Sequence, residues 1–473
     1  MSIKTLPKKW EKDTIGNLIE SSNTGLVRGA KDQSSSKQFD YLKMNNLNTK
    51  GDFEISNLIK VDASDEEVNK FSLQYNDFIF NTRNSVELVG KCGVFLHRTE
   101  KKILFNNNLL RIRFHKIEPK IIAYWFNSAE GKYQLRNITS ATTSVAAIYQ
   151  KALVALDVPV PPLAEQKEIV KQLEGLLAKV DSIKNRLDSI PDIIKRFRQS
   201  VLASAVSGKL TEGVKTENIK NWKPIKLQDA ANIIDPQPSH RTPKEVSGGI
   251  PYIGIGDLKP DGSIDFSRAR KVSIDVLKEH NNRYQLKLGD FVFGKIGTLG
   301  KATVLPMDID YTLSANVILI QPNLDVSNAT YIMLFLSAPS TMDEIARQSN
   351  STSQAAFGIK KMRNFACELP PVSEQNEIVR RVEQFFTFAD KIEEKVNAAQ
   401  ERVNNLTQSI LAKAFRGELT AEWRELNQAL ITGENSAEAL LAKIQAERDA
   451  LSKKKSPKKK PVKKQTTTRK AQD

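Results

Sequence analysis

The strongest constraint on the fold is an internal repeat. Residues 161–170 have the sequence PPLAEQKEIV, and residues 370–379 have the sequence PPVSEQNEIV. The match continues without a gap to GKLT at 208–211 in the first copy and GELT at 417–420 in the second. An ungapped duplication of this length indicates a doubled gene, and it predicts a chain built from two copies of one unit.

Each copy predicts a long helix that pairs with another helix. Apolar residues recur at alternating steps of four and three, which is the heptad spacing of a coiled coil. A Pro-Pro pair precedes each segment, and Gly208 or Gly417 follows it, as expected for the first turn and the left-handed C-terminal cap of a helix. The two helices are expected to pair with each other, and the intervening domain makes an antiparallel arrangement easy to build. The seam residues are Leu173, Val180, Leu187 and Ile194 in the first copy and Val382, Ile392, Val396 and Val403 in the second.

Two globular segments, residues 1–155 and 216–364, alternate with the helical segments 156–215 and 365–425. Both segments open near a tryptophan and continue as short apolar runs broken by Gly, Asn, Asp and Pro, which indicates mixed α and β structure. Residues 426–473 predict a helical extension followed by a disordered, Lys-rich tail. The predicted fold class is therefore α+β, with two globular α/β domains separated by two long antiparallel helices in a coiled coil, and with pseudo-two-fold internal symmetry.

The charge of the chain favours a polyanionic partner. The formal net charge is +16, and nucleic acid is the first expectation for a balance of this size. Residues 451–473 hold ten Lys or Arg and one Asp, and the other 450 residues still carry a net charge of +7. Two cysteines and four histidines are too few for a disulfide framework or a cysteine-based zinc site. The sequence shows no apolar signal core and no run long enough to cross a bilayer, so we expect a cytoplasmic protein without a membrane partner.

The motifs of common active sites are missing from the sequence. The loop GKIGTLGKAT at 294–303 resembles a phosphate-binding loop, but Lys295 occupies a required glycine position and Ala302 replaces the required Ser or Thr. No Asn-Pro-Pro-Tyr or Asp-Pro-Pro-Tyr box of a base methyltransferase is present. We therefore predict a chain without catalytic residues and without a metal site.

Polar and basic loops are the candidate DNA-binding regions. Arg, Lys, Ser and Thr are residue types that reach phosphates and base edges, although such loops are also common as ordinary solvated turns. The Ser/Thr-rich segments 142–144 and 351–353 recur at equivalent places in the repeat, and they fit a helix cap equally well. The candidate contacts are Arg28, Lys31, Arg83, Thr142, Thr143, Arg241, Lys295, Thr298, Ser351 and Thr352.

The chain resembles the specificity subunit of Type I restriction-modification enzymes. The resemblance rests on PPLAEQKEIV, LLAKVDSIKNRL, IPDIIKRFRQSVL and SGKLT with their second-copy equivalents, and on Leu6, Pro7 and Trp10 near the N-terminus. It covers the chain to about residue 425, and the Lys-rich tail departs from it. The resemblance implies two target-recognition domains that each bind half of a bipartite site in double-stranded DNA, and spacer helices that fix the gap between the half-sites.

The resemblance also implies the partners. Two copies of a modification (methyltransferase) subunit would dock on the repeated helices, and restriction/translocase subunits would join them. S-adenosylmethionine, ATP and Mg are then expected in those partner subunits, and no cofactor is expected in this chain.

Two other classes of protein are open on the sequence alone. The first is a structural coiled-coil scaffold that joins two protein-binding domains without sequence-specific DNA binding, which the basic excess outside the tail disfavours. The second is a self-sufficient enzyme such as a fused methyltransferase, which the missing catalytic box disfavours.

Overall fold

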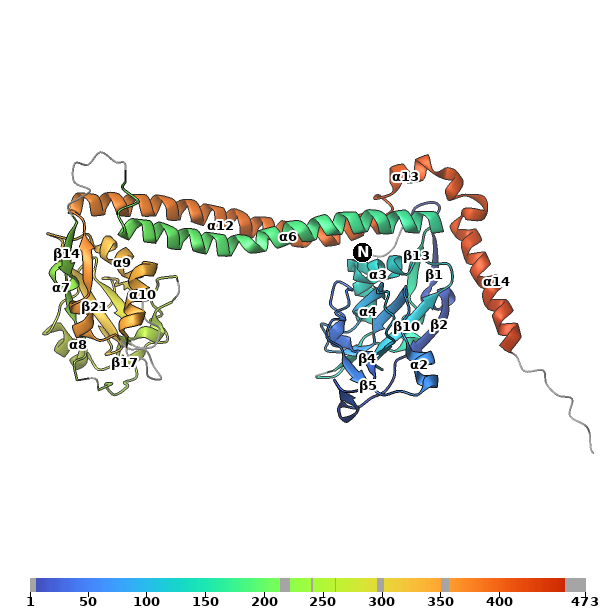
Figure 1. Ribbon diagram of the computed structural model, residues 1–473, viewed down its shortest axis with the longest axis horizontal. Coiled ribbons are helices and arrows are strands. Elements are labelled where there is room, and N and C mark those ends of the chain that lie inside the picture. Colours follow the sequence, from blue (N-terminus) through green and yellow to red (C-terminus); the bar gives the residue numbers. More distant parts are fainter. Residues whose placement is uncertain are drawn as a thin grey trace, which may run out of the picture. The chain divides into compact units, whose positions relative to one another are not determined.

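The structure is a computed structural model of the chain (Figure 1). It describes residues 6–143, 145–212, 222–239, 241–259, 261–295, 302–349 and 357–455. The chain divides into two compact units: unit 1 comprises Met1–Asn185 and Gln400–Asp473, and unit 2 comprises Arg186–Ala399. Domain 1 denotes the globular part at residues 1–155, and domain 2 denotes the globular part at residues 216–364.

Domain 1 is built on a four-stranded sheet with the order β2-β10-β6-β8 and antiparallel pairing throughout. Strands β6 and β8 are buried along their whole length, and between the polar ends Asp77 and Asn81 of β6 the apolar residues face both sides of the sheet. Helix α3 packs on these two strands, and it begins at Pro119, whose fixed φ suits a first helical turn. These elements are β2 (Ile19–Thr24), β6 (Asp77–Asn81), β8 (Cys92–Phe95), β10 (Leu109–Phe114) and α3 (Pro119–Asn127).

Smaller elements surround this sheet. A second sheet has the order β3-β5-β4-β9, a small one has the order β11-β12-β7, and β1 pairs with β13 so that the two ends of the domain meet. The remaining elements are β1 (Glu11–Thr14), α1 (Ile15–Leu18), η1 (Ala30–Asp32), β3 (Gln33–Ser34), β4 (Phe39–Leu42), η2 (Met44–Asn46), β5 (Ile59–Val61), α2 (Asp65–Phe71), β7 (Arg83–Asn84), β9 (Ile103–Phe105), α4 (Ala129–Asn137), β11 (Ser140–Ala141), β12 (Ala146–Ala147), α5 (Gln150–Val154) and β13 (Asp157–Val160).

Domain 2 repeats the plan of domain 1. Its main sheet has the order β15-β21-β18-β19, helix α9 packs on it, and β14 pairs with β22 to close the domain. A second sheet has the order β17-β16-β20. The elements are β14 (Lys223–Lys226), α7 (Leu227–Ala230), β15 (Ala231–Ile234), β16 (Ile250–Ile253), η3 (Ile255–Asp257), β17 (Arg270–Val272), α8 (Ile274–Asn281), β18 (Phe291–Gly294), β19 (Ala302–Val304), β20 (Thr312–Leu313), β21 (Val317–Pro322), α9 (Ala329–Ser337), α10 (Pro339–Gln348), α11 (Ile359–Arg363) and β22 (Ala366–Leu369).

The two repeated segments form helices of 44 residues each, α6 (Leu163–Val206) and α12 (Val372–Phe415). Each begins directly after its Pro-Pro pair, and each is followed by a glycine with positive φ, 76° at Gly208 and 71° at Gly417. The predicted starts and glycine caps are therefore confirmed. Both helices pass through both units, so the division by contacts falls inside the helices, whereas the repeat divides the chain at their ends.

The helices run antiparallel where they pair in unit 2. The ring of Phe197 in α6 contacts that of Phe385 in α12, and later residues of α6 pack with earlier residues of α12 in one core. Most of the predicted seam residues are buried. Leu187 and Ile392 are half-buried, and the other predicted seam residues are at most 7 % exposed: Leu173, Val180, Ile194, Val382, Val396 and Val403.

Each domain rests on both long helices. In unit 1 the core of domain 1 includes Ile169 and Leu173 of α6 together with Leu411 of α12. In unit 2 the core of domain 2 includes Ile378 and Val382 of α12, which are the repeat equivalents of Ile169 and Leu173. The same positions of the repeat therefore seat each domain, and the predicted α+β class with two domains and two long helices is confirmed.

A C-terminal extension follows α12 in unit 1. It comprises α13 (Ala421–Leu426), η4 (Gln428–Leu430), η5 (Gly433–Asn435) and α14 (Ala437–Lys455). Leu440 and Ile444 of α14 are buried in the core of domain 1, and Arg448 donates to the carbonyl and the side chain of Asn17. α14 lies in the region for which a helical extension was predicted, and the predicted disordered tail lies outside the described residues. None of the helices described is long and apolar enough to span a membrane.

Candidate nucleic-acid interface

A buried carboxylate anchors domain 1 at the start of α6. Glu165 is fully buried and accepts hydrogen bonds from the indole of Trp10 at 2.9 Å and the hydroxyl of Thr420 at 2.7 Å. Arg424 adds a third donor at 2.9 Å. The carboxylate therefore joins the first residues of domain 1, the beginning of α6 and the segment that follows α12.

Domain 2 has the same anchor with the chain segments exchanged. Glu374, near the start of α12, accepts from the hydroxyl of Thr211 at 2.7 Å and from the indole of Trp222 at 3.2 Å. Thr211 belongs to the GKLT that ends the first repeat, whereas Thr420 belongs to the GELT that ends the second. Each domain is thus held by the beginning of one long helix and the end of the other.

The glutamine after each of these glutamates completes the anchor. Gln166 donates to the carbonyl of Pro161 and accepts from the backbone N–H of Glu118, at the start of α3. Gln375 donates to the carbonyl of Pro370 and accepts from the N–H of Asn328, at the start of α9. The anchoring role of the repeated Glu-Gln pair was not predicted from the sequence. The signal for its anchoring role was available, because the Glu-Gln pair and the tryptophan recur together.

The predicted contacts of domain 1 differ in whether their side chains are exposed or are paired within the domain. Arg28 is engaged within the domain, since it pairs with Glu67 at 2.7 Å. Lys31, Arg83, Thr142 and Thr143 are exposed, and the hydroxyl of Thr142 donates to the carbonyl of Val145 within its own loop. Their contact with DNA stays a prediction.

Of the five predicted contacts of domain 2, two lie within the described residues. Arg241 is exposed in the loop after β15. Lys295 is buried, and its ammonium pairs with Asp235 at 3.0 Å. The remaining three predicted contacts, Thr298, Ser351 and Thr352, lie outside the described residues.

The loop that carries Arg241 is supported by a buried histidine. The ring of His280 in α8 contacts the hydroxyl of Thr312 and the side-chain oxygen of Gln237. Gln237 in turn donates to the carbonyl of Arg241 at 3.3 Å. Since an amide oxygen only accepts, Nε2 of His280 carries the proton, and burial lowers the pKa of this ring. A neutral histidine therefore positions the backbone of a predicted contact loop.

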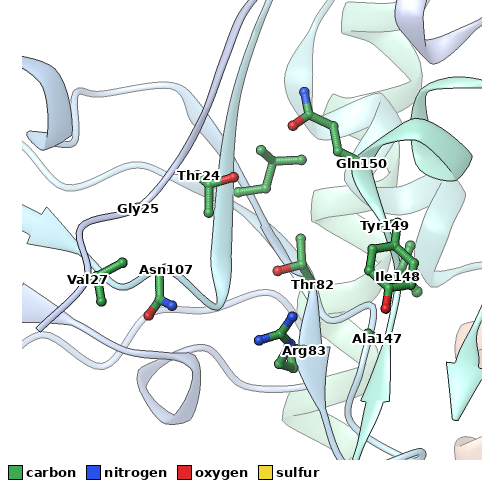
Figure 2. Close-up of a pocket in the computed structure, with 11 residues that line it drawn as sticks. Thr24, Gly25, Val27, Thr82, Arg83, Asn107, Ala147, Ile148, Tyr149 and Gln150 are labelled. Carbon is green, nitrogen blue, oxygen red and sulfur yellow. The ribbon is translucent and has the colours of Figure 1, made fainter. Parts of the chain in front are cut away.

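Domain 1 has a cavity of about 450 Å³ at the end of its main sheet (Figure 2). It lies where β2 and β6 end and where the chain passes from β12 to α5. Apolar side chains form part of its wall, and hydroxyl, amide, phenol and guanidinium groups form the rest. The polar lining residues are Thr24, Thr82, Arg83, Asn107, Tyr149 and Gln150.

Neither cysteine of the chain has the environment of a nucleophile. Cys92 and Cys367 are buried and unpaired, and burial raises the pKa of their thiols to about 12 and about 11. Among the described residues, no group of three or more His, Cys, Asp or Glu is placed to hold a metal ion.

The family of the chain follows from its match to a family model. Residues 7–192 and 219–402 match the model described as the Type I restriction modification DNA specificity domain. The chain belongs to this family. The two matched ranges correspond to the two halves of the repeat, and each contains one domain and most of one long helix. Type I specificity subunits are the DNA sequence-recognition subunits of their complexes and have no catalytic residues of their own.

Curated specificity subunits extend the match over nearly the whole chain. The chain is 38% identical over 375 residues to the Type I restriction enzyme EcoBI specificity subunit of Escherichia coli, covering 74% of this chain and 78% of the relative. It is 35% identical over 474 residues to the StySPI specificity subunit of Salmonella potsdam, covering 96% of this chain and 99% of the relative.

Solved structures confirm the fold of this specificity subunit. The HsdS subunit from Thermoanaerobacter tengcongensis superimposes with a TM-score of 0.57 at 17% identity, over 88% of this chain and 98% of that chain. A chain solved in work on complex assembly and conformational transition of the type I R-M system gives a TM-score of 0.63 at 18% identity, over 87% of this chain and 99% of that chain.

Proposed function

We propose that this specificity subunit binds a bipartite site in double-stranded DNA, with one half-site on each domain and an unspecified gap of fixed length between them. The observation that carries the proposal is the repeated anchor. The same Glu-Gln pair at the start of each long helix holds a domain whose other residues differ strongly from those of its counterpart. Two domains that differ in sequence but are attached to the helices in the same way are suited to recognise two different short DNA sequences.

The repeat also supports the proposed partners. Two copies of one modification subunit need two equivalent docking surfaces, and the duplicated helices supply the same surface twice. Restriction/translocase subunits would complete the assembly. S-adenosylmethionine, ATP and Mg would act in these partners, and a protein that works on DNA with them would be cytoplasmic.

The exposed basic side chains support DNA as the ligand. Lys31, Arg83 and Arg241 are exposed on the two domains, and the chain without its last 23 residues carries a net charge of +7. Phosphate contacts would supply affinity that depends on salt, and contacts to base edges would supply specificity.

Single-molecule methylome sequencing tests this function. A host strain without restriction activity would express the modification subunit with the full-length chain, and a matched strain would express the modification subunit alone. We expect methylation of a split motif with a fixed gap only when the chain is present. A chimaera that carries the domain 1 of a relative should then change one half of the motif and leave the other half and the gap unchanged.

Two outcomes would contradict the proposal. A continuous motif would exclude recognition by two separate domains. An absence of any motif, in a strain where the chain and the modification subunit co-purify, would favour the structural-scaffold alternative.

A further inference from the structure

The two domains share one backbone framework at the end of the main sheet. In domain 1, Ile79 of β6 pairs with Arg111 of β10, and Arg111 pairs with Asn23 of β2. In domain 2, Val292 of β18 pairs with Leu319 of β21, which pairs with Ile234 of β15. These registers make Thr24, the last residue of β2, equivalent to Asp235, and they make Thr82, which follows β6, equivalent to Lys295.

Two backbone hydrogen bonds confirm this equivalence. The N–H of Ile148 donates to the carbonyl of Thr82 at 2.9 Å, and the N–H of Phe357 donates to the carbonyl of Lys295 at 2.9 Å. Ile148 and Phe357 are also equivalent in the repeat, 209 residues apart. A second pair of bonds agrees: the N–H of Thr82 donates to the carbonyl of Asn108 at 2.9 Å, and the N–H of Lys295 donates to the carbonyl of Asn316 at 3.0 Å.

The side chains on this shared framework are different. In domain 2 the two positions hold the Lys295–Asp235 ion pair, whose side chains are 11% and 19% exposed. In domain 1 the same positions hold Thr24 and Thr82, which line the open cavity (Figure 2). Two neighbouring positions differ as well, since Asn107 corresponds to Ala315 and Tyr149 to Gly358. The two domains therefore have the same backbone arrangement at these positions but different side chains.

The lining of the domain 1 cavity includes an arginine whose charge is not paired with any described residue. Arg83 is exposed, and its guanidinium makes no hydrogen bond or ion pair with any residue that the structure describes. Its backbone is fixed, because β7 pairs with β12 through Arg83 and Ala147. At the same rim, Tyr149 is 61% exposed and Val27 is 68% exposed. A fixed arginine beside hydroxyl groups and exposed apolar surface is suited to the edge of a base pair.

We propose that this cavity is the base-reading site of domain 1 and that Arg83 donates to O6 and N7 of a guanine in the major groove. Thr82 and Asn107 then supply further polar groups to the same or the adjacent base pair. Tyr149 and Val27 supply apolar contact, of the kind that a thymine methyl group makes. The Lys295–Asp235 pair gives the equivalent site of domain 2 a different chemistry, so the two half-sites differ at this position.

This inference rests on the proposed function, and the experiment separates the two. The full-length chain with its modification subunit would be compared with R83A and N107A by methylome sequencing. N107A introduces the residue that domain 2 has at the equivalent position, so the backbone tolerates it. We expect R83A to lose selectivity at one G·C position of one half-site, with a drop of about 10- to 100-fold in methylation of the original motif, and with the other half-site unchanged.

A control variant tests whether loss of any positive charge from domain 1 is enough to change the motif, and a salt titration tests the type of DNA contact. R136A removes an exposed positive charge from α4 of the same domain, and it should leave the motif unchanged. Salt titrations of DNA binding by the assembled complex distinguish a base contact from a phosphate contact, because loss of a phosphate contact weakens binding to all sequences and lowers the salt dependence.

The outcomes are distinct. No motif with the unaltered chain would defeat the proposed function itself. A split motif that R83A and N107A both leave unchanged, or weaken uniformly at every position, would overturn the base-reading site while the proposed function stands.

Discussion

Glu165 and Glu374 are charged groups placed where water does not reach, at 0% and 7% exposed. Burial of a carboxylate is unfavourable unless donors replace its hydration. Glu165 accepts from an indole, a hydroxyl and a guanidinium, and Glu374 accepts from an indole and a hydroxyl. Because these donors come from separate segments, each carboxylate stabilises the junction only when all segments are in place.

The first prediction concerns this junction. In Glu165→Gln, one carboxylate oxygen becomes an N–H₂ group that faces donors, so the free energy of unfolding should fall by about 2 kcal/mol. Calorimetry of the full-length chain would measure the change. Glu425→Gln is the matched control, because Glu425 is exposed on α13. An unchanged transition in Glu165→Gln would contradict the anchoring role.

The second prediction is a pH dependence from His280. Burial lowers the pKa of this ring below its usual value of 6.5, so the unfolded chain binds the proton more tightly than the folded chain. The stability is therefore fully present above about pH 6.5 and decreases as the pH falls below that value. Urea unfolding of the chain between pH 7.5 and 5.5 should show this decrease, and His280→Gln should reduce the slope. An equal slope in both proteins would exclude His280 as its source.

Single residues were the hardest level to predict from the sequence. The candidate contacts were chosen by residue type, and residue type does not reveal the partner that a side chain finds in the fold. Arg28 pairs with Glu67, and Lys295 pairs with Asp235, 60 residues earlier in the chain. Arg83 has the same charge and makes no such pair with any described residue. Only the tertiary structure separates an arginine that is occupied from one that is free.

At the scale of elements, α14 is a helix whose stability depends on packing against domain 1. Leu440 and Ile444 lie on its buried face, and Glu447 forms an ion pair with Lys116 and lies 3.5 Å from Nδ1 of His115. The same surface of domain 2 has no helix of this kind among the described residues, since the repeat ends before the extension begins. The extension therefore acts on one domain only.

The third prediction tests this asymmetry. Ile444→Ala removes a side chain that is 2% exposed, and the loss should be about 2–4 kcal/mol. Hydrogen exchange should become faster in domain 1, around α1 and β10, and should stay unchanged in domain 2. Leu451→Ala is the control on the same helix, because Leu451 is 44% exposed. Faster exchange in both domains would show that α14 stabilises more than domain 1.

The long helices were predicted well because their signals are local. The heptad spacing, the Pro-Pro starts and the glycine caps all lie within a few residues of the feature that they determine. The width of the buried face was less predictable. Phe385 and Leu406 fit the spacing but are 40% and 41% exposed, because a pair of helices covers a narrower stripe than a larger bundle does.

For the whole molecule, the repeat predicted two domains and two paired helices but not which segments pack on each domain. Sequence similarity identifies copies, whereas packing joins pieces that differ. Unit 1 consists of the first 185 residues and the last 74, and unit 2 consists of the residues between them. The Trp10–Glu165–Thr420 junction shows the reason, since its members come from the beginning, the middle and the end of the chain.

The composition of unit 1 has a consequence for synthesis. Domains usually fold in the order in which the ribosome releases them. Here domain 1 emerges before domain 2, but Leu411, Leu440 and Ile444 of its core are made only after the whole of unit 2. All of unit 2 is released before residue 400, so the second domain to be translated is the first that can complete its core. Until Ile444 has been released, the nascent chain carries domain 1 with part of its apolar core surface uncovered, and chaperones that bind such surfaces can bind it for that whole interval.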